Sequence, residues 1–149
     1  MKIIKRNPLF FAFFFPALVD GAITLLGQSP EYWSNKTVNE ASPAYYFLYY
    51  SPWLFIAGSV VWFTSWYLIF LKLKEPLNLF LMFLFIAGHS WGSTSWIWNI
   101  AKRNGLYTPF NQTSVVLVWC AVVVYFALIA MFATYSLRIY LHQKKLNSN

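Results

Sequence analysis

Long stretches without a charged residue dominate the pattern of hydrophobic and polar positions along the chain. Residues 41–71, 76–101 and 104–137 form uncharged stretches of 31, 26 and 34 residues. Each is longer than the roughly 20 residues that an α-helix needs to cross the hydrocarbon core of a bilayer. A shorter stretch, residues 7–28, is interrupted only by Asp20. The pattern therefore predicts four transmembrane helices.

These stretches predict an all-α fold, in which one domain over residues 1–149 is a polytopic membrane protein with four transmembrane helices in one bundle. No alternation of apolar and polar residues with short, regular turns indicates a β-barrel. Pro52 is expected to separate an interfacial aromatic segment from the second helix, and Asn111 or Thr113 is expected to cap the fourth. The helices are expected at about 8–27, 51–71, 77–100 and 113–141, with an outer loop at about 28–43.

Composition agrees with a membrane location. Only 10% of the residues are charged and 59% are hydrophobic, whereas about a quarter of the residues of a soluble domain are charged. The net charge of +7 could indicate a nucleic-acid partner. However, the basic residues flank the apolar stretches, so we interpret them as topology signals and expect no nucleic acid. The first apolar run resembles a signal peptide, but Asp20 follows it at once, which favours a retained helix.

The distribution of basic residues predicts the orientation of the chain. With a cytoplasmic N-terminus, eight lysines and arginines fall on the cytoplasmic side and three on the outer side, so both termini are expected in the cytoplasm. The loops at 28–43 and 101–112 are then expected to face outward. We expect a multi-pass protein of the cell membrane, such as the inner membrane of a bacterium. The eight residues are Lys2, Lys5, Arg6, Lys72, Lys74, Arg138, Lys144 and Lys145, and the three are Lys36, Lys102 and Arg103.

Two ionisable side chains lie inside the expected helices. Asp20 is 13 residues beyond Asn7, and His89 is 14 residues beyond Glu75, which places both about 20 Å from their cytoplasmic ends. A charged side chain in the middle of a bilayer costs at least about 2.5–3.5 kcal/mol, so we expect both residues to face a common interior at the same depth. A contact between them is geometrically possible, but the pattern does not indicate whether the first and third helices are neighbours.

Three roles are open to His89. It can be a neutral residue that donates one hydrogen bond to a neighbouring helix, a paired histidine that carries a proton or binds a ligand, or a metal ligand. The third role is disfavoured because no second histidine lies three or four residues away. The sequence also contains no nucleotide fingerprint and no phosphate loop. We therefore expect no metal and no cofactor.

Small and polar residues around His89 form two neighbouring stripes on the third helix. Gly88 and Gly92 have a small-x-x-x-small spacing, so we expect them to pack closely against another helix. Asn39 and Glu40 of the outer loop either cap backbone groups or fold back over the polar residues. The fourth helix is mostly apolar and is expected to form a lipid-facing wall. The candidates for a polar cluster or for ligand binding are Asp20, Thr24, Asn39, Glu40, His89, Ser93, Trp96 and Asn99.

The segments VDGAITLLGQSPEYW, NEASP and GHSWGSTSW together resemble a group of small, uncharacterised bacterial integral membrane proteins. The resemblance covers most of the chain and implies a four-helix membrane protein, but it implies no activity. Small multidrug exporters differ, since their first helix carries a glutamate and they lack the long outer loop. Sterol-isomerase-like four-helix proteins also differ, because the second helix of this chain lacks the acid that such a resemblance requires.

Three functions are compatible with this sequence. The first is an accessory or structural subunit whose polar stripes bind a helix of another membrane protein or of a second copy. The second is a small proton-coupled transporter that uses Asp20 and His89. The third is an enzyme or binding protein for a lipid-soluble ligand, with the same two residues as acid and base. We favour the first function, whereas a cavity lined by the polar residues would favour the other two.

Overall fold

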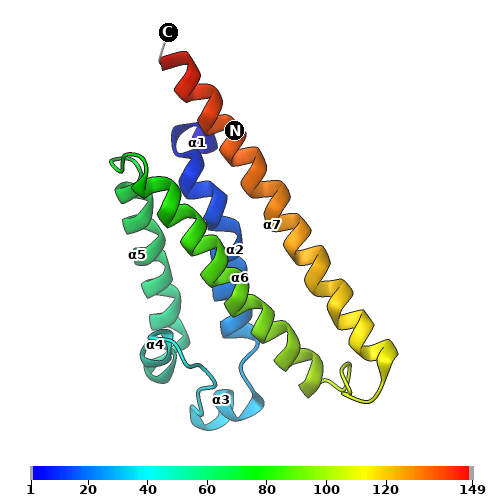
Figure 1. Cartoon of the computed structure of the whole chain (residues 1–149). Coiled ribbons are helices and arrows are strands. Elements are labelled where there is room, and N and C mark those ends of the chain that lie inside the picture. Colours follow the sequence, from blue (N-terminus) through cyan, green and yellow to red (C-terminus); the bar gives the residue numbers. More distant parts are fainter. Residues whose placement is uncertain (1, 148–149) are drawn as a thin grey trace.

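The computed structural model describes residues 2–147, which are all-α and contain no β-strand. Four long helices run along the molecule, and three short helices lie near its ends (Figure 1). The long helices are α2 (Pro8–Leu26), α5 (Pro52–Phe70), α6 (Leu77–Arg103) and α7 (Gln112–Asn147), and the short ones are α1 (Lys2–Arg6), α3 (Pro30–Asn35) and α4 (Ala44–Tyr50).

Three of the long helices, α2, α5 and α7, are long and apolar enough to cross a membrane. These helices indicate a membrane protein. The fourth, α6, has 27 residues and is about 40 Å long at 1.5 Å per residue. It carries the polar segment GHSWGSTSW in its middle, and it is not among the helices apolar enough to cross. The length of α6 therefore suits a crossing better than its composition does.

The helix α1 and the C-terminal end of α7 lie at the same end of the bundle, together with the turn between α5 and α6 (Figure 1). The side-chain amide of Gln143 on α7 donates a 2.7 Å hydrogen bond from Nε2 to the carbonyl oxygen of Lys5 on α1. The helices α3 and α4 and the loop between α6 and α7 lie at the opposite end. The four long helices therefore alternate in direction along the chain.

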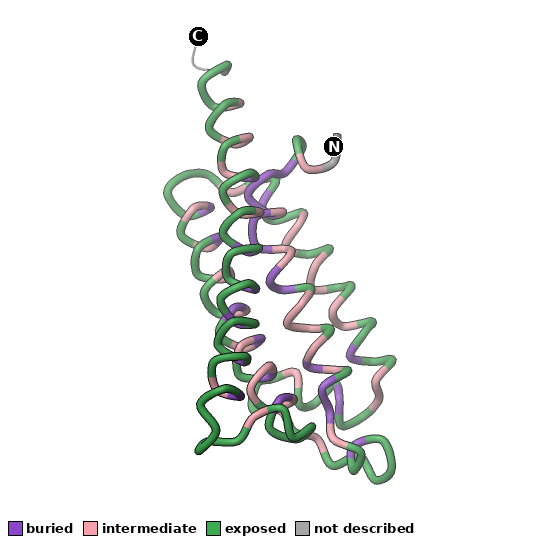
Figure 2. Tube along the Cα trace, turned by 90° about the vertical axis from the view of Figure 1, so that its right-hand side faces the viewer, coloured by how far each residue is buried: buried purple, intermediate pink, exposed green. Residues whose placement is uncertain are grey.

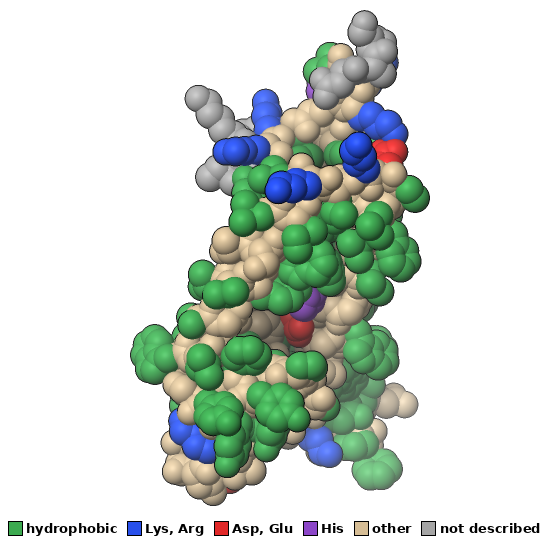
Figure 3. All heavy atoms as spheres, turned by 90° about the vertical axis from the view of Figure 1, so that its left-hand side faces the viewer, with side chains coloured by type: hydrophobic (Ala, Val, Ile, Leu, Met, Phe, Trp, Pro, Cys, Tyr) green, Lys and Arg blue, Asp and Glu red, His purple; other side chains and the backbone are tan. Residues whose placement is uncertain are grey.

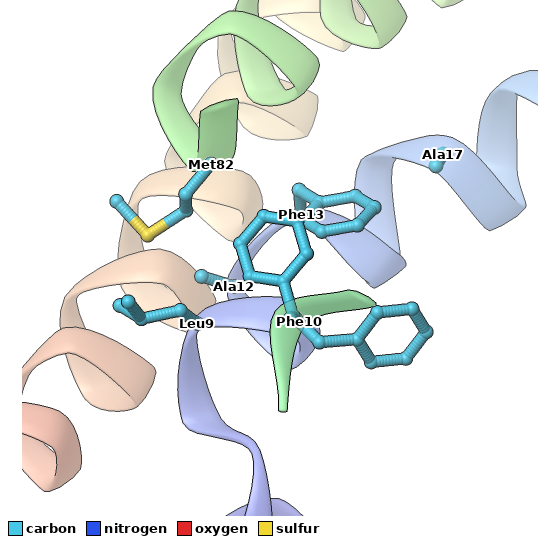
Figure 4. Packing of buried hydrophobic residues seen from close by; sticks show 7 residues of the cluster. Leu9, Phe10, Ala12, Phe13, Ala17 and Met82 are labelled. Carbon is cyan, nitrogen blue, oxygen red and sulfur yellow. The ribbon is translucent and has the colours of Figure 1, made fainter. Parts of the chain in front are cut away.

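The helix α2 is the centre of the bundle, because α5, α6 and α7 all pack against it. Figure 2 shows buried positions toward the interior and exposed positions on most of the outer faces. The Phe13 ring of α2 lies 5.1 Å from the Phe70 ring and 4.9 Å from the Phe85 ring, so one side chain of α2 joins α5 to α6. The buried cluster around it consists of Leu9, Phe10, Ala12, Phe13, Ala17, Phe70 and Met82 (Figure 4).

The last helix, α7, is longer than the sequence pattern predicted. It continues to Asn147 instead of ending near residue 141. Lys144 Nζ lies 2.6 Å from Glu75 Oε2, and the Tyr140 hydroxyl donates a 2.7 Å hydrogen bond to Glu75 Oε1. These contacts fasten the last turns of α7 to the α5–α6 turn, which explains why the helix continues into a polar sequence.

The same contacts make the anchor of α7 sensitive to acid. The hydrogen bonds from Lys144 and Tyr140 lower the pKa of the Glu75 carboxyl below its ordinary value. A carboxyl with a lowered pKa in the folded protein contributes stability above its unfolded pKa, and that contribution is lost as the pH falls through the folded pKa. The contact between Glu75 and α7 therefore weakens at low pH.

Some of the other predicted helix boundaries differ from those in the structure, and others are confirmed. The helix α6 continues to Arg103 instead of residue 100, and the expected outer loop contains the short helix α3. The separation at Pro52 is confirmed, since α4 ends at Tyr50 and α5 begins at Pro52. The cap at Asn111 is also confirmed, because the backbone N–H of Ser114 donates a 3.3 Å hydrogen bond to Asn111 Oδ1.

The helices α2 and α6 approach each other closely at the end of α2. A Cβ atom at Gly27 would lie 2.8 Å from Trp96 Cε3 and 3.0 Å from Ile100 Cδ1, so the absence of a side chain permits this approach. Arg103 Nη1 donates a 2.8 Å hydrogen bond to the carbonyl oxygen of Gly27. It thereby satisfies one of the carbonyl groups that a helix leaves free at its C-terminal end. These contacts fix how α6 lies along α2, and hence which of their side chains meet at mid-length.

Candidate functional site

Asp20 on α2 and His89 on α6 form a pair well inside the two helices. His89 Nδ1 lies 2.9 Å from Asp20 Oδ2. Each residue is the thirteenth of its helix, about 18 Å from the helix start. An ionised carboxylate only accepts hydrogen bonds, so a proton of the ring lies on Nδ1 when Asp20 is ionised. The structure thus brings together the two ionisable residues whose contact the sequence left open.

Gly92 makes room for the Asp20 carboxylate. A Cβ atom at this position would lie 2.6 Å from Asp20 Oδ1 and 3.0 Å from Oδ2. Gly88, one turn earlier, is exposed, and a Cβ atom there would have nothing within 4 Å. Within residues 2–147, the prediction that Gly88 packs against another helix is therefore wrong. At 100° per residue Gly88 lies about 140° around the helix from the buried Ser93, so it faces away from α2.

Ser93 connects the pair to a third helix. Its side chain is fully buried, and the Tyr125 hydroxyl of α7 donates a 2.8 Å hydrogen bond to Ser93 Oγ. The Ser93 hydroxyl donates in turn to the carbonyl oxygen of His89 at 2.8 Å, and it lies 3.4 Å from Asp20 Oδ1. Side chains from α2, α6 and α7 therefore meet in one hydrogen-bonded network.

Tyr125 is the member of this network that the sequence analysis missed. The prediction that the fourth helix is a lipid-facing wall is wrong for one face of α7, which packs against α2 and α6. Two features of the sequence indicate that face. Residues on one side of a helix recur every three or four positions, and a phenol hydroxyl in an apolar run needs a hydrogen-bond partner. The buried hydrophobic residues of the face are Val118, Val122, Tyr125 and Ile129.

Two aromatic rings border His89. The Trp62 ring of α5 lies edge-on, 5.3 Å from the imidazole, and the Phe85 ring lies 6.3 Å away. The pair is nevertheless not enclosed, because the side chains of Asp20 and His89 are 20% and 25% exposed. Figure 3 shows an acidic and a histidine side chain next to each other in a hollow in the hydrophobic middle of one face. The pair is therefore accessible from the side of the bundle, at mid-height.

The second ring nitrogen of His89 is open to this hollow. Within residues 2–147, Nε2 takes part in no hydrogen bond, whereas Nδ1 is engaged by Asp20. The buried side-chain polar atoms without a partner in that part of the chain are Ser90 Oγ and Ser136 Oγ, so Nε2 is not a buried atom. With its proton on Nδ1, a neutral ring presents Nε2 as an acceptor, and a protonated ring presents it as a donor.

Two other candidates lie on the same helices as the pair but serve packing. Thr24, one turn after Asp20, is buried, and its carbonyl oxygen accepts a 3.0 Å hydrogen bond from Gln28 Nε2. Trp96 is buried against Gly27. Trp96 therefore belongs to the contact between α2 and α6, and both residues lie on the side of the pair that is nearer to α3.

The remaining candidates are not brought to the pair. Glu40 Oε1 accepts a 2.8 Å hydrogen bond from the backbone N–H of Ser42, and the backbone N–H of Asn39 donates a 2.9 Å bond to Gln28 Oε1. The contact of Glu40 corresponds to the first of the two roles considered, capping of a backbone group, whereas the contact of Asn39 is made by its own backbone N–H and the Gln28 side chain. Asn99 is exposed on α6. No hydrogen bond between Asn39, Glu40 or Asn99 and the pair occurs in the described chain.

The arrangement can hold a proton and can orient a polar group. A carboxylate that binds Nδ1 fixes the tautomer and the orientation of an imidazole, and it leaves Nε2 as the reacting or binding atom. Ser93 is not placed as a nucleophile, because its buried hydroxyl already donates to the His89 carbonyl. Among residues 2–147, no three histidine, cysteine or acidic residues lie close enough together to hold a metal ion.

Comparisons with known proteins add no relative to this picture. No protein family, no curated protein and no solved structure matches the chain. The function must therefore be argued from the geometry of the site.

The hydrogen bond from Tyr125 gives a direct test of the network. We expect Tyr125→Phe to lower the free energy of unfolding in detergent by about 0.6 kcal/mol and by no more than about 1.7 kcal/mol, the range for interhelical hydrogen bonds in membrane proteins. Tyr135→Phe is the matched control, because Tyr135 lies on the same helix and is exposed. Combined with Ser93→Ala, Tyr125→Phe should add little further loss. Additive losses would mean that the two hydroxyls do not interact.

Proposed function

We propose that this chain is a four-pass protein of the cell membrane with both termini in the cytoplasm, and that it acts as an accessory subunit of a membrane assembly. The observation that carries this proposal is the partial exposure of the Asp20–His89 pair at mid-height of the bundle. A partner that supplies a polar group to His89 Nε2 completes the site.

The proposal of a fourth crossing rests on where α6 directs its polar groups. Ser93 is buried inside the bundle and bonded to Tyr125 and to the His89 carbonyl, and Thr94 Oγ1 donates a 2.8 Å hydrogen bond to the carbonyl oxygen of Ser90. Polar side chains are tolerated at membrane depth when they face the interior and find partners there. At about 40 Å, α6 also exceeds the roughly 30 Å of a hydrocarbon core. Its polar composition is therefore compatible with a crossing.

The proposed orientation rests on the unequal charges of the two ends. Figure 3 shows basic side chains at both ends of the molecule and hydrophobic side chains between them. The end that holds α1 and the C-terminal part of α7 carries most of the lysines and arginines, and an excess of basic residues marks the cytoplasmic side. The basic residues of the opposite end are Lys36, Lys102 and Arg103.

The exposed pair is costly unless something covers it. A single charged side chain at the middle of a bilayer costs about 2.5–3.5 kcal/mol on the scale derived from insertion experiments. The contact between Asp20 and His89 offsets part of this cost, but it leaves one-fifth of the Asp20 side chain and one-quarter of the His89 side chain exposed. Burial of the hollow beneath a partner removes the remaining contact with lipid and engages Nε2.

The shape of the polar surface favours a partner helix over a small molecule. Gly88, Ser95 and Asn99 are exposed on α6 and follow the same helical stripe as Gly92, which touches Asp20. The stripe from residue 88 to residue 99 is about 16 Å long at 1.5 Å per residue. Small residues and exposed amides are the features by which transmembrane helices associate. A helix of another subunit, or of a second copy, fits this stripe.

A lipid-soluble ligand is the second candidate occupant of the hollow. It is favoured by the aromatic side chains of Trp62 and Phe85, which border His89 and form an apolar wall. A ligand with one polar group could bind Nε2 and pack its apolar part against these rings. In this alternative the occupant is a small molecule and the stripe of α6 stays in contact with lipid.

Purification in mild detergent with lipids retained, followed by native mass measurement, distinguishes the two occupants. We expect the wild-type chain to carry a second polypeptide and Gly88→Leu to lose it. Gly88 is exposed, and a Cβ atom there would have nothing of the described chain within 4 Å, so the melting temperature of the isolated chain should not fall. Ala87→Leu is the matched control, because Ala87 is also exposed but lies about 100° further around α6.

Each outcome of this measurement decides between the proposals. Loss of the partner in Gly88→Leu but not in Ala87→Leu supports an accessory subunit. A chain that carries only a small molecule, which His89→Gln loses, contradicts the accessory role and supports ligand binding. A wild-type chain with neither occupant contradicts both.

The number of crossings is tested separately by reporter fusions. A reporter after residue 149 should lie in the cytoplasm, because four crossings return the chain to its starting side. A reporter within residues 34–40 should lie outside. If α6 did not cross, the reporter after residue 149 would lie outside as well, and the four-pass topology would be refuted.

A further inference from the structure

A second polar site lies at the end of the bundle where α1 and α7 meet. A cleft of about 450 Å³ opens between α1, the start of α2, the α5–α6 turn and α7. Its apolar lining includes Leu71 and Leu73. Its basic lining residues are Arg6, Lys74 and Lys144. The cleft combines positive charge with an apolar wall, and it lies at the opposite end of the bundle from α3 and α4 (Figure 1).

The positive charge of the cleft is only partly compensated. Glu75 is the one acid among its lining residues, and both of its oxygens are engaged by Lys144 and Tyr140. Arg6 and Lys74 are exposed, and neither has an ion-pair partner within residues 2–147. Two cations therefore face the cleft without a counter-charge from the described chain.

The position of the cleft along the bundle matches the headgroup level of a membrane. Pro8 begins α2 and Phe70 ends α5, so the lining includes the ends of two apolar helices and the basic turn beyond them. Apolar helix ends lie at the edge of the hydrocarbon core, and the adjoining basic residues lie among the phosphates. The cytoplasmic leaflet, which this end faces in the proposed orientation, is the anionic one.

We propose that this cleft binds the phosphate group of an anionic phospholipid. The guanidinium of Arg6 can hold two phosphate oxygens at once, and Lys74 adds a point charge. Leu71, which is 39% exposed, and Leu73 line the same cleft and offer contact to the upper part of the acyl chains. Basic pockets between transmembrane helices on the cytoplasmic side bind phosphorylated headgroups in this way. The proposal depends on the membrane location of the chain and not on a partner at His89.

A matched pair of variants separates a specific cleft from general basic charge. Arg6→Gln with Lys74→Gln removes two cations that line the cleft. Lys5→Gln with Lys72→Gln removes two cations from the same end, and neither residue lines the cleft. All four residues are exposed, so both variants should keep the melting temperature of the wild type. The net charge of the two variants is identical.

The measurement is native mass spectrometry of the full chain in neutral detergent, titrated with phosphatidylglycerol, phosphatidylcholine or inorganic phosphate. We expect tight binding of one phosphatidylglycerol and weaker binding of phosphatidylcholine. The affinity for phosphatidylglycerol should fall roughly 25-fold in the Arg6→Gln, Lys74→Gln variant, which corresponds to about 1 kcal/mol for each basic residue. The Lys5→Gln, Lys72→Gln variant should bind it as the wild type does.

Three results would overturn the proposal. Equal losses in both variants would mean that general charge, and not the cleft, attracts the lipid. Equal binding of phosphatidylcholine and phosphatidylglycerol would mean that the anionic headgroup is not selected. Binding of inorganic phosphate, with no preference for the lipid over the free ion, would assign the cleft to a soluble phosphate. If the double variant does not fold, Lys74→Gln compared with Lys72→Gln gives the same test with one charge.

Discussion

A carboxylate well inside an apolar helix needs a partner, and the contact between Asp20 and His89 meets this need. The pair fixes several other features of the bundle. Gly92 lacks a side chain where the carboxylate lies, since even a Cβ atom would come within 2.6 Å of it. Ser93 follows one turn after His89 and directs its hydroxyl to the His89 carbonyl, and Tyr125 brings α7 to the same point. Three helices are thus joined at one level by polar side chains, which have few other hydrogen-bond partners in an apolar environment.

The pair also divides the molecule into two regions with different chemistry. On the side of the termini, α2, α5 and α6 are joined by aromatic packing around Phe13, and the bundle ends in the basic cleft. On the other side, polar and small residues of α6 become exposed beside the hollow. The proposed partner and the proposed phospholipid therefore occupy different levels of the membrane. Each site can be altered by substitutions that leave the other intact, because Gly88 and Arg6 lie on different helices at different heights.

Much of the fold followed from the spacing of charges along the sequence. Uncharged stretches indicated the long helices, and a rise of 1.5 Å per residue placed Asp20 and His89 at the same depth. Counting along an axis gives height, but it does not give the direction in which a side chain points. The contact of the pair, the exposure of Gly88 and the buried face of α7 all depend on the rotation of one helix against another. The continuation of α7 to Asn147 depends on contacts with Glu75, which is 69 residues away from Lys144 in the sequence.

Cysteine cross-linking in native membranes tests the central contact most directly. In a Cys120→Ser background, the pair Asp20→Cys and His89→Cys should be joined by a short reagent within one chain, because the two native side chains lie 2.9 Å apart. The pair Asp20→Cys and Leu84→Cys should not be joined, since Leu84 is exposed and lies on the side of α6 opposite the buried Ser93. Cross-linking of the first pair alone is the predicted result. Absence of the first cross-link, or equal yields for both pairs, would contradict the account.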